Sequence, residues 1–248
     1  MDLFDIDYSW LFLILLPIVA FLYSSVGHGG ASGYLGMMAL FEFAPETMKP
    51  TALLLNLFVA AISFYHYWRG GHFNFKLFIP FAIASIPLSF VGGMIDLDAI
   101  IYKQILGVLL LIAILRMLNI IGKEGKEIRR VKLWQGLLCG GGIGFFSGLI
   151  GIGGGIILTP VILILHWGKM KEAAAVSALF IWVNSAAGLG GQLIGGVELG
   201  VGAFLMVVFA VIGGFFGGYF GSQKINNRSL RYLLAIVLLM ASVKLFLA

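Results

Sequence analysis

The sequence reads GHGGASGYLGMMALFEF at residues 27–43 and GIGGGIILTPVILILHW at residues 151–167, and these two stretches decide the fold. Each opens on a cluster of glycines, and the clusters lie 124 residues apart in a chain of 248. The apolar runs that follow, Tyr34–Phe43 and Ile156–Trp167, are shorter than the about 20 residues a helix needs to cross a membrane. The pair predicts a chain built twice, with one short helix in each half.

The composition predicts that the rest of the chain is embedded in lipid. Hydrophobic residues make up 60% of the chain and charged residues 11%, against about 45–50% and about 25% in soluble domains. Eight further apolar segments approach or reach the length of a membrane span: 10–25, 52–68, 77–95, 100–118, 133–150, 173–193, 201–220 and 232–247. We therefore expect an all-α integral membrane protein with eight to ten transmembrane helices, two of its ten segments being short or re-entrant.

The repeat extends beyond the glycine clusters. Further matches at shifts of 122 to 125 residues join Met48-Lys49 to Met170-Lys171, Gly70-Gly71 to Gly195-Gly196, and Phe90–Gly93 to Phe215–Gly218. Each half holds five segments, so an odd number of crossings forces the second half to enter the membrane from the opposite side. We predict one membrane domain with a first inverted repeat at 1–120, a cytoplasmic connector at 121–132 and a second repeat at 133–248. Inverted repeats with interrupted segments in matching positions are typical of secondary transporters.

The basic residues predict the orientation. With alternating segments, one set of loops holds 13 of the 16 basic residues: Arg69, Lys76, Arg116, Lys123, Lys126, Arg129, Arg130, Lys132, Lys169, Lys171, Lys224, Arg228 and Arg231. The other set holds Lys49, Lys103 and Lys244, together with most of the acidic residues. By the positive-inside rule the first set is cytoplasmic and both termini are external. The sidedness is the same if each short segment and the segment before it form a re-entrant hairpin. Four tryptophans near span ends, Trp10, Trp68, Trp134 and Trp167, are predicted interfacial anchors.

The glycine clusters are the predicted substrate site. Glycine lets a backbone unwind and approach a ligand, and a helix that starts at such a break directs free N–H groups at an anion. The residues expected to bind substrate are Gly27, His28, Gly29, Gly30, Gly151, Gly153, Gly154 and Gly155. The other glycine pairs, at 92–93, 140–142, 213–214 and 217–218, are predicted to allow close helix packing instead.

Polar residues inside the apolar segments are further candidates, because their burial in lipid is costly. His28 is a candidate for carrying a coupling proton, or else for a hydrogen bond to a neighbouring carbonyl. Asn56 and Asn184 could donate hydrogen bonds to an oxyanion, or serve as contacts between helices. Thr51, Ser177 and Ser185 complete the set, with Gln192 as a weaker candidate. His66, Arg69 and His72 are predicted to lie at a cytoplasmic span end rather than in the site.

These motifs resemble the TauE/SafE sulfite-exporter family. The resemblance lies in Gly151–Pro160, Lys171–Ser177 and Asn184–Gly188 of the second half, and in Gly27–Gly33 with Lys49–Ala52 of the first. It covers essentially the whole chain and implies a membrane permease for sulfite, sulfonates or related sulfur-containing anions. The first half departs from the pattern at Ala31, and it has Gly36 where the second has Pro160, so the anion itself stays open.

Two other classes of function are a cation transporter or channel and a protease. The carboxylates Glu42, Asp96, Asp98 and Glu198 all fall at segment ends, which disfavours a cation transporter or channel. The string Gly30–Gly33 matches the GxSG motif of rhomboid-type intramembrane proteases, with Ser32 as the nucleophile and His66 as a candidate base. Such a short match occurs easily by chance in a glycine-rich chain. We predict no enzyme, no cofactor and no metal site, because the four histidines lack ligand spacing and Cys139 is a single thiol. The predicted partners are a small anion and the lipid bilayer of the cell membrane, with no nucleic acid. A proton or sodium ion is a candidate coupling partner, and a homodimer is a candidate assembly.

Overall fold

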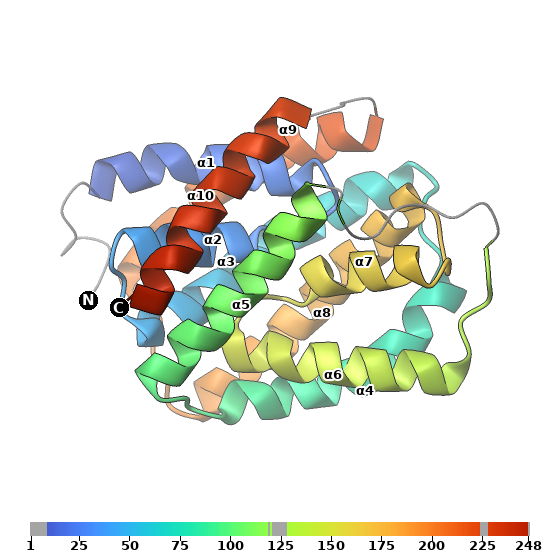
Figure 1. Ribbon diagram of the computed structural model, residues 1–248, viewed down its shortest axis with the longest axis horizontal. Coiled ribbons are helices and arrows are strands. Elements are labelled where there is room, and N and C mark those ends of the chain that lie inside the picture. Colours follow the sequence, from blue (N-terminus) through green and yellow to red (C-terminus); the bar gives the residue numbers. More distant parts are fainter. Residues whose placement is uncertain (1–8, 119, 121–127, 224–227, 248) are drawn as a thin grey trace.

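The computed structural model describes residues 9–118, 120, 128–223 and 228–247, which form ten α-helices and no strand (Figure 1). The helices are α1 (Ser9–Ser24), α2 (Ala31–Leu40), α3 (Pro45–Arg69), α4 (Phe75–Met94), α5 (Ala99–Met117), α6 (Leu133–Ile150), α7 (Gly155–Ile164), α8 (Met170–Ile194), α9 (Val201–Gln223) and α10 (Arg228–Leu247). Five of them, α3, α4, α6, α8 and α9, are by themselves long and apolar enough to cross a membrane. The prediction of an all-α membrane protein is confirmed.

The helix lengths repeat. The first five helices have 16, 10, 25, 20 and 19 residues, and the second five have 18, 10, 25, 23 and 20. At 1.5 Å per residue, α2 and α7 are about 15 Å long, roughly half the thickness of the hydrocarbon core. Both end early because a residue in the left-handed conformation follows, Glu42 (φ 64°) and His166 (φ 58°). The two predicted short segments are therefore half-helices that end at equivalent positions.

Each half-helix forms a hairpin with the helix before it. The ring of Phe12 near the start of α1 lies 5.4 Å from that of Phe41 and 5.1 Å from that of Phe43, just past the end of α2. In the second half, the Arg129 N–H ahead of α6 donates to the His166 carbonyl past the end of α7 (2.7 Å). Each hairpin thus begins and ends at one face of the bundle, and its glycine cluster forms the tip inside the protein.

The two halves run in opposite directions. Helices α3 and α8 occupy equivalent positions and pack antiparallel, since Leu53 lies by Gly188, Asn56 by Ser185 and Tyr67 by Ala174. Figure 1 shows the same inversion for α1, which runs from left to right, and α6, which runs from right to left. This arrangement agrees with the predicted inverted repeat.

Glycine ridges join helices of different halves. In α6, Gly136, Gly140, Gly144 and Gly148 lie against α4, and in α9, Gly213, Gly217 and Gly221 lie against α1. A Cβ at any of these positions would collide with the neighbouring helix, most often with its backbone. The packing role predicted for the pairs at 92–93, 213–214 and 217–218, and for Gly140 and Gly141, is confirmed. It is wrong for Gly142, which has no atom within 4 Å of its Cβ position, because Gly142 faces outward from α6.

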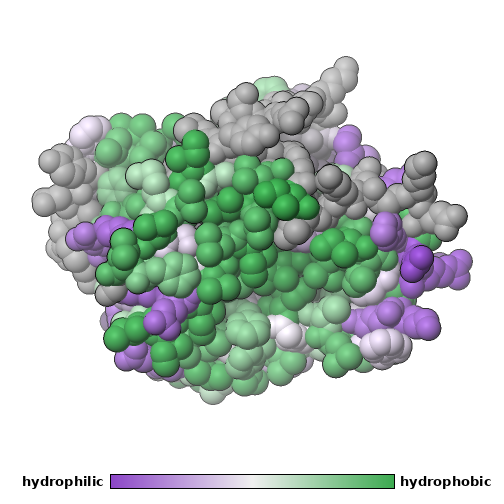
Figure 2. All heavy atoms as spheres, in the orientation of Figure 1, coloured by the Kyte–Doolittle hydropathy of each residue, from purple (hydrophilic) through white to green (hydrophobic). Residues whose placement is uncertain are grey.

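The outer surface has an apolar band between two polar ends, as Figure 2 shows. We call one end the basic end, which carries Arg69, Lys76, Arg129, Arg130, Lys132, Lys169 and Lys171, and the other the acidic end, which carries Glu42, Glu46, Asp96, Asp98 and Glu198. The charges predicted at Lys123, Lys126 and Lys224, and most of the 121–132 connector, lie outside the described residues, as do the side chains of Arg116, Arg228 and Arg231.

Three of the four predicted tryptophan anchors are exposed: Trp10, Trp68 and Trp134. The prediction is wrong for Trp167, which is buried with its ring 5.7 Å from that of Phe81. The turn after α7 directs this side chain into the core between α4 and α7.

Candidate functional site

The two glycine clusters are sharp backbone turns at the tips of the hairpins. Positive φ angles occur at Gly27 (79°), Gly30 (103°), Gly151 (85°), Gly153 (76°) and Gly154 (78°), a region that residues with a Cβ rarely adopt. Gly30 precedes α2 and Gly154 precedes α7, and neither helix start is capped by a side chain. The first N–H groups of both half-helices are therefore available inside the protein.

The Asn56 side chain of α3 lies between the two turns. A Cβ on Gly29 would collide with Asn56 Oδ1, and a Cβ on Gly153 would come within 2.5 Å of Asn56 Nδ2. The Asn56 amide donates to the Ser185 hydroxyl of α8 (3.2 Å), whereas its Oδ1 has no hydrogen-bond partner although the residue is fully buried. Ile181 of α8 lies against the same two glycines. The centre of the repeat is thus lined by an amide from α3 and an aliphatic side chain from α8.

A chain of polar groups leads from the first turn into the second half. His28 Nδ1 lies 3.0 Å from the Val26 carbonyl, and His28 Nε2 lies 3.3 Å from the Thr159 hydroxyl of α7. Thr159 in turn hydrogen-bonds the Ser177 hydroxyl of α8 (2.8 Å). Since a carbonyl can only accept, Nδ1 carries a hydrogen, and Nε2 accepts from Thr159 in a neutral ring or donates to it in a protonated one. The protonation state of His28 therefore sets the direction of its hydrogen bond with Thr159, while the bond to Val26 keeps its direction.

The structure brings most of the predicted site residues together. His28, Ser177, Asn56 and Ser185 join the two turns through the contacts above. Gly27 packs on Ala174, Gly151 packs on Lys49, and Gly155 packs on Ile181.

Two predicted residues lie apart from this centre. The Asn184 amide donates to the Phe180 carbonyl of its own helix (2.7 Å), and Thr51 is buried on α3 more than a turn before Asn56. Thr159 was not predicted as a site residue, although it lies within the motif Gly151–Pro160.

The centre contains no buried acid. Among the described residues, no aspartate or glutamate is buried, and Lys49 is the one buried side chain with a formal charge. His28 is 5% exposed, and Asn56, Thr159, Ser177 and Ser185 are fully buried. The site is accordingly closed to both ends in this conformation, and its chemistry is that of hydrogen-bond donors without a carboxylate.

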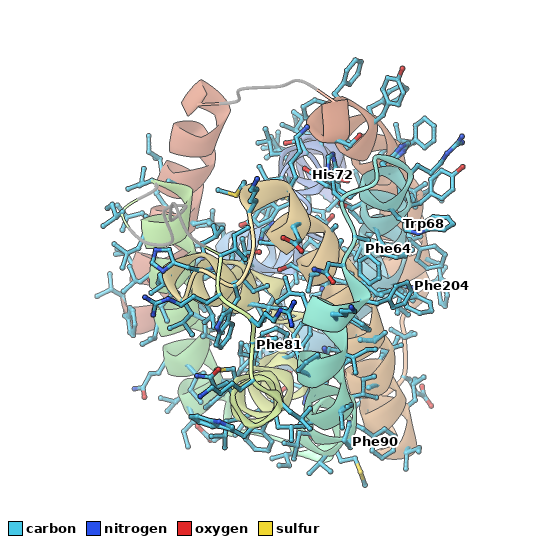
Figure 3. The ribbon with its side chains drawn as sticks, turned by 90° about the vertical axis from the view of Figure 1, so that its right-hand side faces the viewer. Phe64, Trp68, His72, Phe81, Phe90 and Phe204 are labelled. Atoms are coloured by element: carbon cyan, nitrogen blue, oxygen red, sulfur yellow. The ribbon has the colours of Figure 1, made fainter. Side chains whose placement is uncertain are left out.

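An open cleft of about 950 Å³ lies at the basic end between the α3–α4 loop and the start of α8. Its lining includes His72, Lys76, Lys169 and Lys171. Burial, and then the nearby charge of Lys171, lower the pKa of His72. Figure 3 views the bundle from this end and shows His72 nearer its middle, while Trp68 points to the side. Glu172 also lines the cleft, so three lysines against one carboxylate leave it with a net positive charge at neutral pH.

At the acidic end, the smaller cavity of about 320 Å³ contains Glu42, Lys103 and Lys244. The hydrogen bond from Lys244 to Glu42 (2.9 Å), together with its charge, lowers the pKa of the Glu42 carboxyl.

Two inverted hairpins whose unwound tips meet at a buried polar centre, within an all-helical bundle of apolar surface, are typical of membrane transporters. The chain belongs to the family described as "Sulfite exporter TauE/SafE", whose model matches residues 11–245.

Three relatives carry matching names. The chain is 35% identical to the "Probable membrane transporter protein y4hK" of Sinorhizobium fredii, covering 92% of this chain and 94% of that one. It is 28% identical to the "Probable membrane transporter protein MJ0441" of Methanocaldococcus jannaschii, with the same coverages, and 25% identical to the "Probable membrane transporter protein YunE" of Bacillus subtilis, with 82% of each covered. No solved structure matches the chain. The chain is a multi-pass membrane transporter.

Proposed function

We propose that the transported substrate is a small oxyanion, such as sulfite or an organic sulfonate, bound between the two glycine turns. The observation that carries the proposal is the Asn56 amide between two uncapped helix starts, in a core where no described carboxylate is buried. Helix N-termini favour negative charge, and the Asn56 amide nitrogen can donate to it. A cation in the same place would face the positive ends of two helix dipoles, with no carboxylate ligand among the described buried residues.

On binding, the oxyanion exchanges the water molecules around it for a fixed set of hydrogen-bond donors in the protein. The oxyanion accepts from the first N–H groups of α2 and α7 and from the Asn56 amide, which swings away from Ser185. The hydroxyls of Thr159 and Ser177 and the His28 ring lie on the side of α7 and α8 and give further donors. Selectivity for an oxyanion follows because an apolar solute would leave these buried donors unpaired.

Alternating access would follow from the glycine ridges. Helices α4 and α6 are packed through glycines over their length, as are α9 and α1, so each pair moves as one body. The contact of Gly27 with Ala174 closes the basic end, and the contact of Gly151 with Lys49 closes the acidic end. Rocking of the pairs around α3 and α8 opens one contact at a time.

The membrane potential sets what coupling is needed. An interior-negative potential favours moving one negative charge outward by about 2.3 kcal/mol per 100 mV, so export runs without a coupling ion. Uptake requires one, and His28 is the group placed to carry a proton. The proposal includes a basic end that faces the cytoplasm and two external termini, by the positive-inside rule.

The structure also bears on the protease alternative. The Ser32 hydroxyl donates to the Tyr23 phenol (2.8 Å), and His66 packs against the rings of Phe215 and Tyr219 in α9. A serine nucleophile needs a base within hydrogen-bond reach, and the described contacts of Ser32 supply none. This arrangement favours transport over intramembrane proteolysis.

Thermal-shift measurements on the purified protein test the proposal. Sulfite, sulfate, alkanesulfonates, carboxylates and monovalent cations are each titrated against the wild type and against Asn56→Leu. We expect sulfite or a sulfonate to raise the unfolding temperature of the wild type and to leave that of the variant unchanged. Stabilisation by cations alone would contradict the anion site.

A further inference from the structure

Lys49 is a buried lysine with no acidic hydrogen-bond partner. It lies on α3, is 8% exposed, and its ammonium donates to the carbonyls of Gly93 (3.3 Å) and Ile95 (3.0 Å) at the end of α4. Asp96 acts on it only at longer range, and no described carboxylate lies within 4 Å. A buried ammonium is costly unless it is fully compensated, and two carbonyls satisfy two of its three hydrogens.

The other half of the molecule shows that the fold does not need this charge. The Lys49 backbone and Cγ (3.2 Å) contact the Cβ position of Gly151 and close the acidic end. At the equivalent contact of the basic end, Gly27 packs on Ala174, a residue with only a methyl group. A glycine packed against the helix backbone therefore suffices for the closing contact, as Gly27 on Ala174 shows, and the ammonium of Lys49 is an addition made at one end only.

The position of the ammonium links it to the substrate turn. The Lys49 side chain crosses Gly151, two residues before the Gly153 that faces Asn56, and ends on α4. Its hydrogen bonds join α3 to α4, so they break when the end of α4 moves away from α3. Opening the acidic end in this way leaves the ammonium beside the turn and short of acceptors.

We propose that Lys49 is a second anion-binding residue, which pairs with the transported oxyanion at the acidic end when that end is open. In the closed state the Gly93 and Ile95 carbonyls hold the ammonium in place, and in the open state the anion replaces them. This inference rests on the proposed transport of oxyanions. It makes anion recognition one-sided, because the basic end has Ala174 in the same place.

The test compares Lys49→Gln with Lys103→Gln in right-side-out and inverted membrane vesicles, using radiolabelled sulfite and an alkanesulfonate. In Lys49→Gln, the glutamine keeps a donor for the two carbonyls and removes the charge. The control Lys103→Gln removes the same charge from the surface of the same end. For Lys49→Gln we expect KM from the acidic-end side to rise by about 10-fold, the size of one lost charge-assisted hydrogen bond. KM from the basic-end side should stay within about twofold, as should both values for Lys103→Gln. Lys49→Arg should retain most of the wild-type KM.

Each other outcome is decisive. An unchanged KM from the acidic-end side in Lys49→Gln overturns the inference. An equal loss of turnover from both sides, together with a lower unfolding temperature, assigns Lys49 a purely structural role and overturns it too. If Lys49→Gln does not reach the membrane, Lys49→Met and Lys49→Arg are compared in the same way. Wild-type vesicles that move neither sulfite nor the sulfonate contradict the proposed function itself, which is a different result from a silent Lys49 variant in a transporting protein.

Discussion

The two glycine turns have similar backbones, which differ in that Gly153 has a positive φ and Gly29 does not, and different side chains. Both are built from left-handed glycines, and both precede a half-helix of 10 residues. The first carries His28 and packs on Ala174, whereas the second carries Ile152 and packs on Lys49, and both lie against Asn56 and Ile181. The backbone turns form a nearly symmetric cradle, and the side chains make it one-sided.

This difference separates what the repeat provides from what the chemistry requires. The donors on the α2 and α7 termini come from the backbone, so both halves supply them equally. The titratable ring of His28 and the amide of Asn56 each come from a single position. Substitutions at the shared and unshared positions therefore have separate consequences.

The largest effect is expected from Asn56→Asp, which puts a carboxylate between the two turns. An uncompensated buried charge costs about 3–5 kcal/mol, and it also repels an anion, so sulfite flux should fall by more than about 100-fold. Asn56→Ser is the matched control, because it shortens the side chain without adding charge, and its loss should be about tenfold or less. Flux in proteoliposomes measures both. Equal losses in the two variants would show that charge at this position is irrelevant.

Gly29→Ala and Gly153→Ala probe the two faces of the same amide. Each Cβ would displace Asn56, and at Gly153 alanine also adopts a left-handed backbone that costs about 1–2 kcal/mol. We expect sulfite flux to fall in both, with the unfolding temperature lowered more in Gly153→Ala. Gly142→Ala is the control, since open space surrounds its Cβ and a helical Gly-to-Ala change stabilises by about 0.5–1 kcal/mol. A loss of flux in the control would undo the site assignment.

His28→Gln tests whether the titratable side chain of the first turn carries the coupling proton. Glutamine can hydrogen-bond Val26 and Thr159 but does not titrate, so flux should persist and lose its dependence on pH between about pH 5 and 8. Thr159→Val breaks the polar chain and leaves the titrating ring, so its pH dependence should shift rather than vanish. If the pH profile of His28→Gln matches that of the wild type, His28 does not carry the coupling proton.

The smallest effect is expected where the half-helices end, at His166 and Glu42. Glycine relieves the left-handed strain at either position, so His166→Gly should stabilise the protein by up to about 1 kcal/mol. Glu42→Gly should stabilise the protein less than His166→Gly, because it loses the ion pair with Lys244.

This difference depends on pH with a defined sign. The folded pKa of Glu42 is lowered, so its ion pair contributes above the pKa of the unfolded state and is lost as the pH falls through the folded value. Thermal unfolding across this acidic range should therefore show the two variants converging. A constant gap would mean that the ion pair contributes nothing.

The sequence allowed the repeat, the inverted orientation and the two half-helices to be predicted, because these depend on the spacing of apolar and glycine residues. The glycines at 27–30 and 151–155 were also found, since duplicated breaks in short segments leave a clear pattern. Helix ends were predicted less well: α3 begins at Pro45, seven residues before the predicted span, because proline is favoured in a first helical turn.

Contacts between distant helices could not be read from local patterns. The pairing of Asn56 with Ser185 depends on the register of α3 against α8, and Asn184, one residue away, turns to its own helix instead. Thr159 was overlooked because a threonine in a helix usually bonds its own backbone. Trp167 was misplaced because a tryptophan next to a span end is as easily buried by a turn as exposed at an interface.

The glycine ridges have a consequence for how the chain is made. Helix α1 leaves the ribosome well before α9, yet α9 packs against α1 through Gly213, Gly217 and Gly221. In the same way, α4 is made before α6, whose glycines pack against it. Neither half can therefore complete its packing before the other is synthesised. The first repeat must therefore stay in the bilayer as a partly assembled intermediate, and the finished protein cannot be divided at its centre into two separately folded halves.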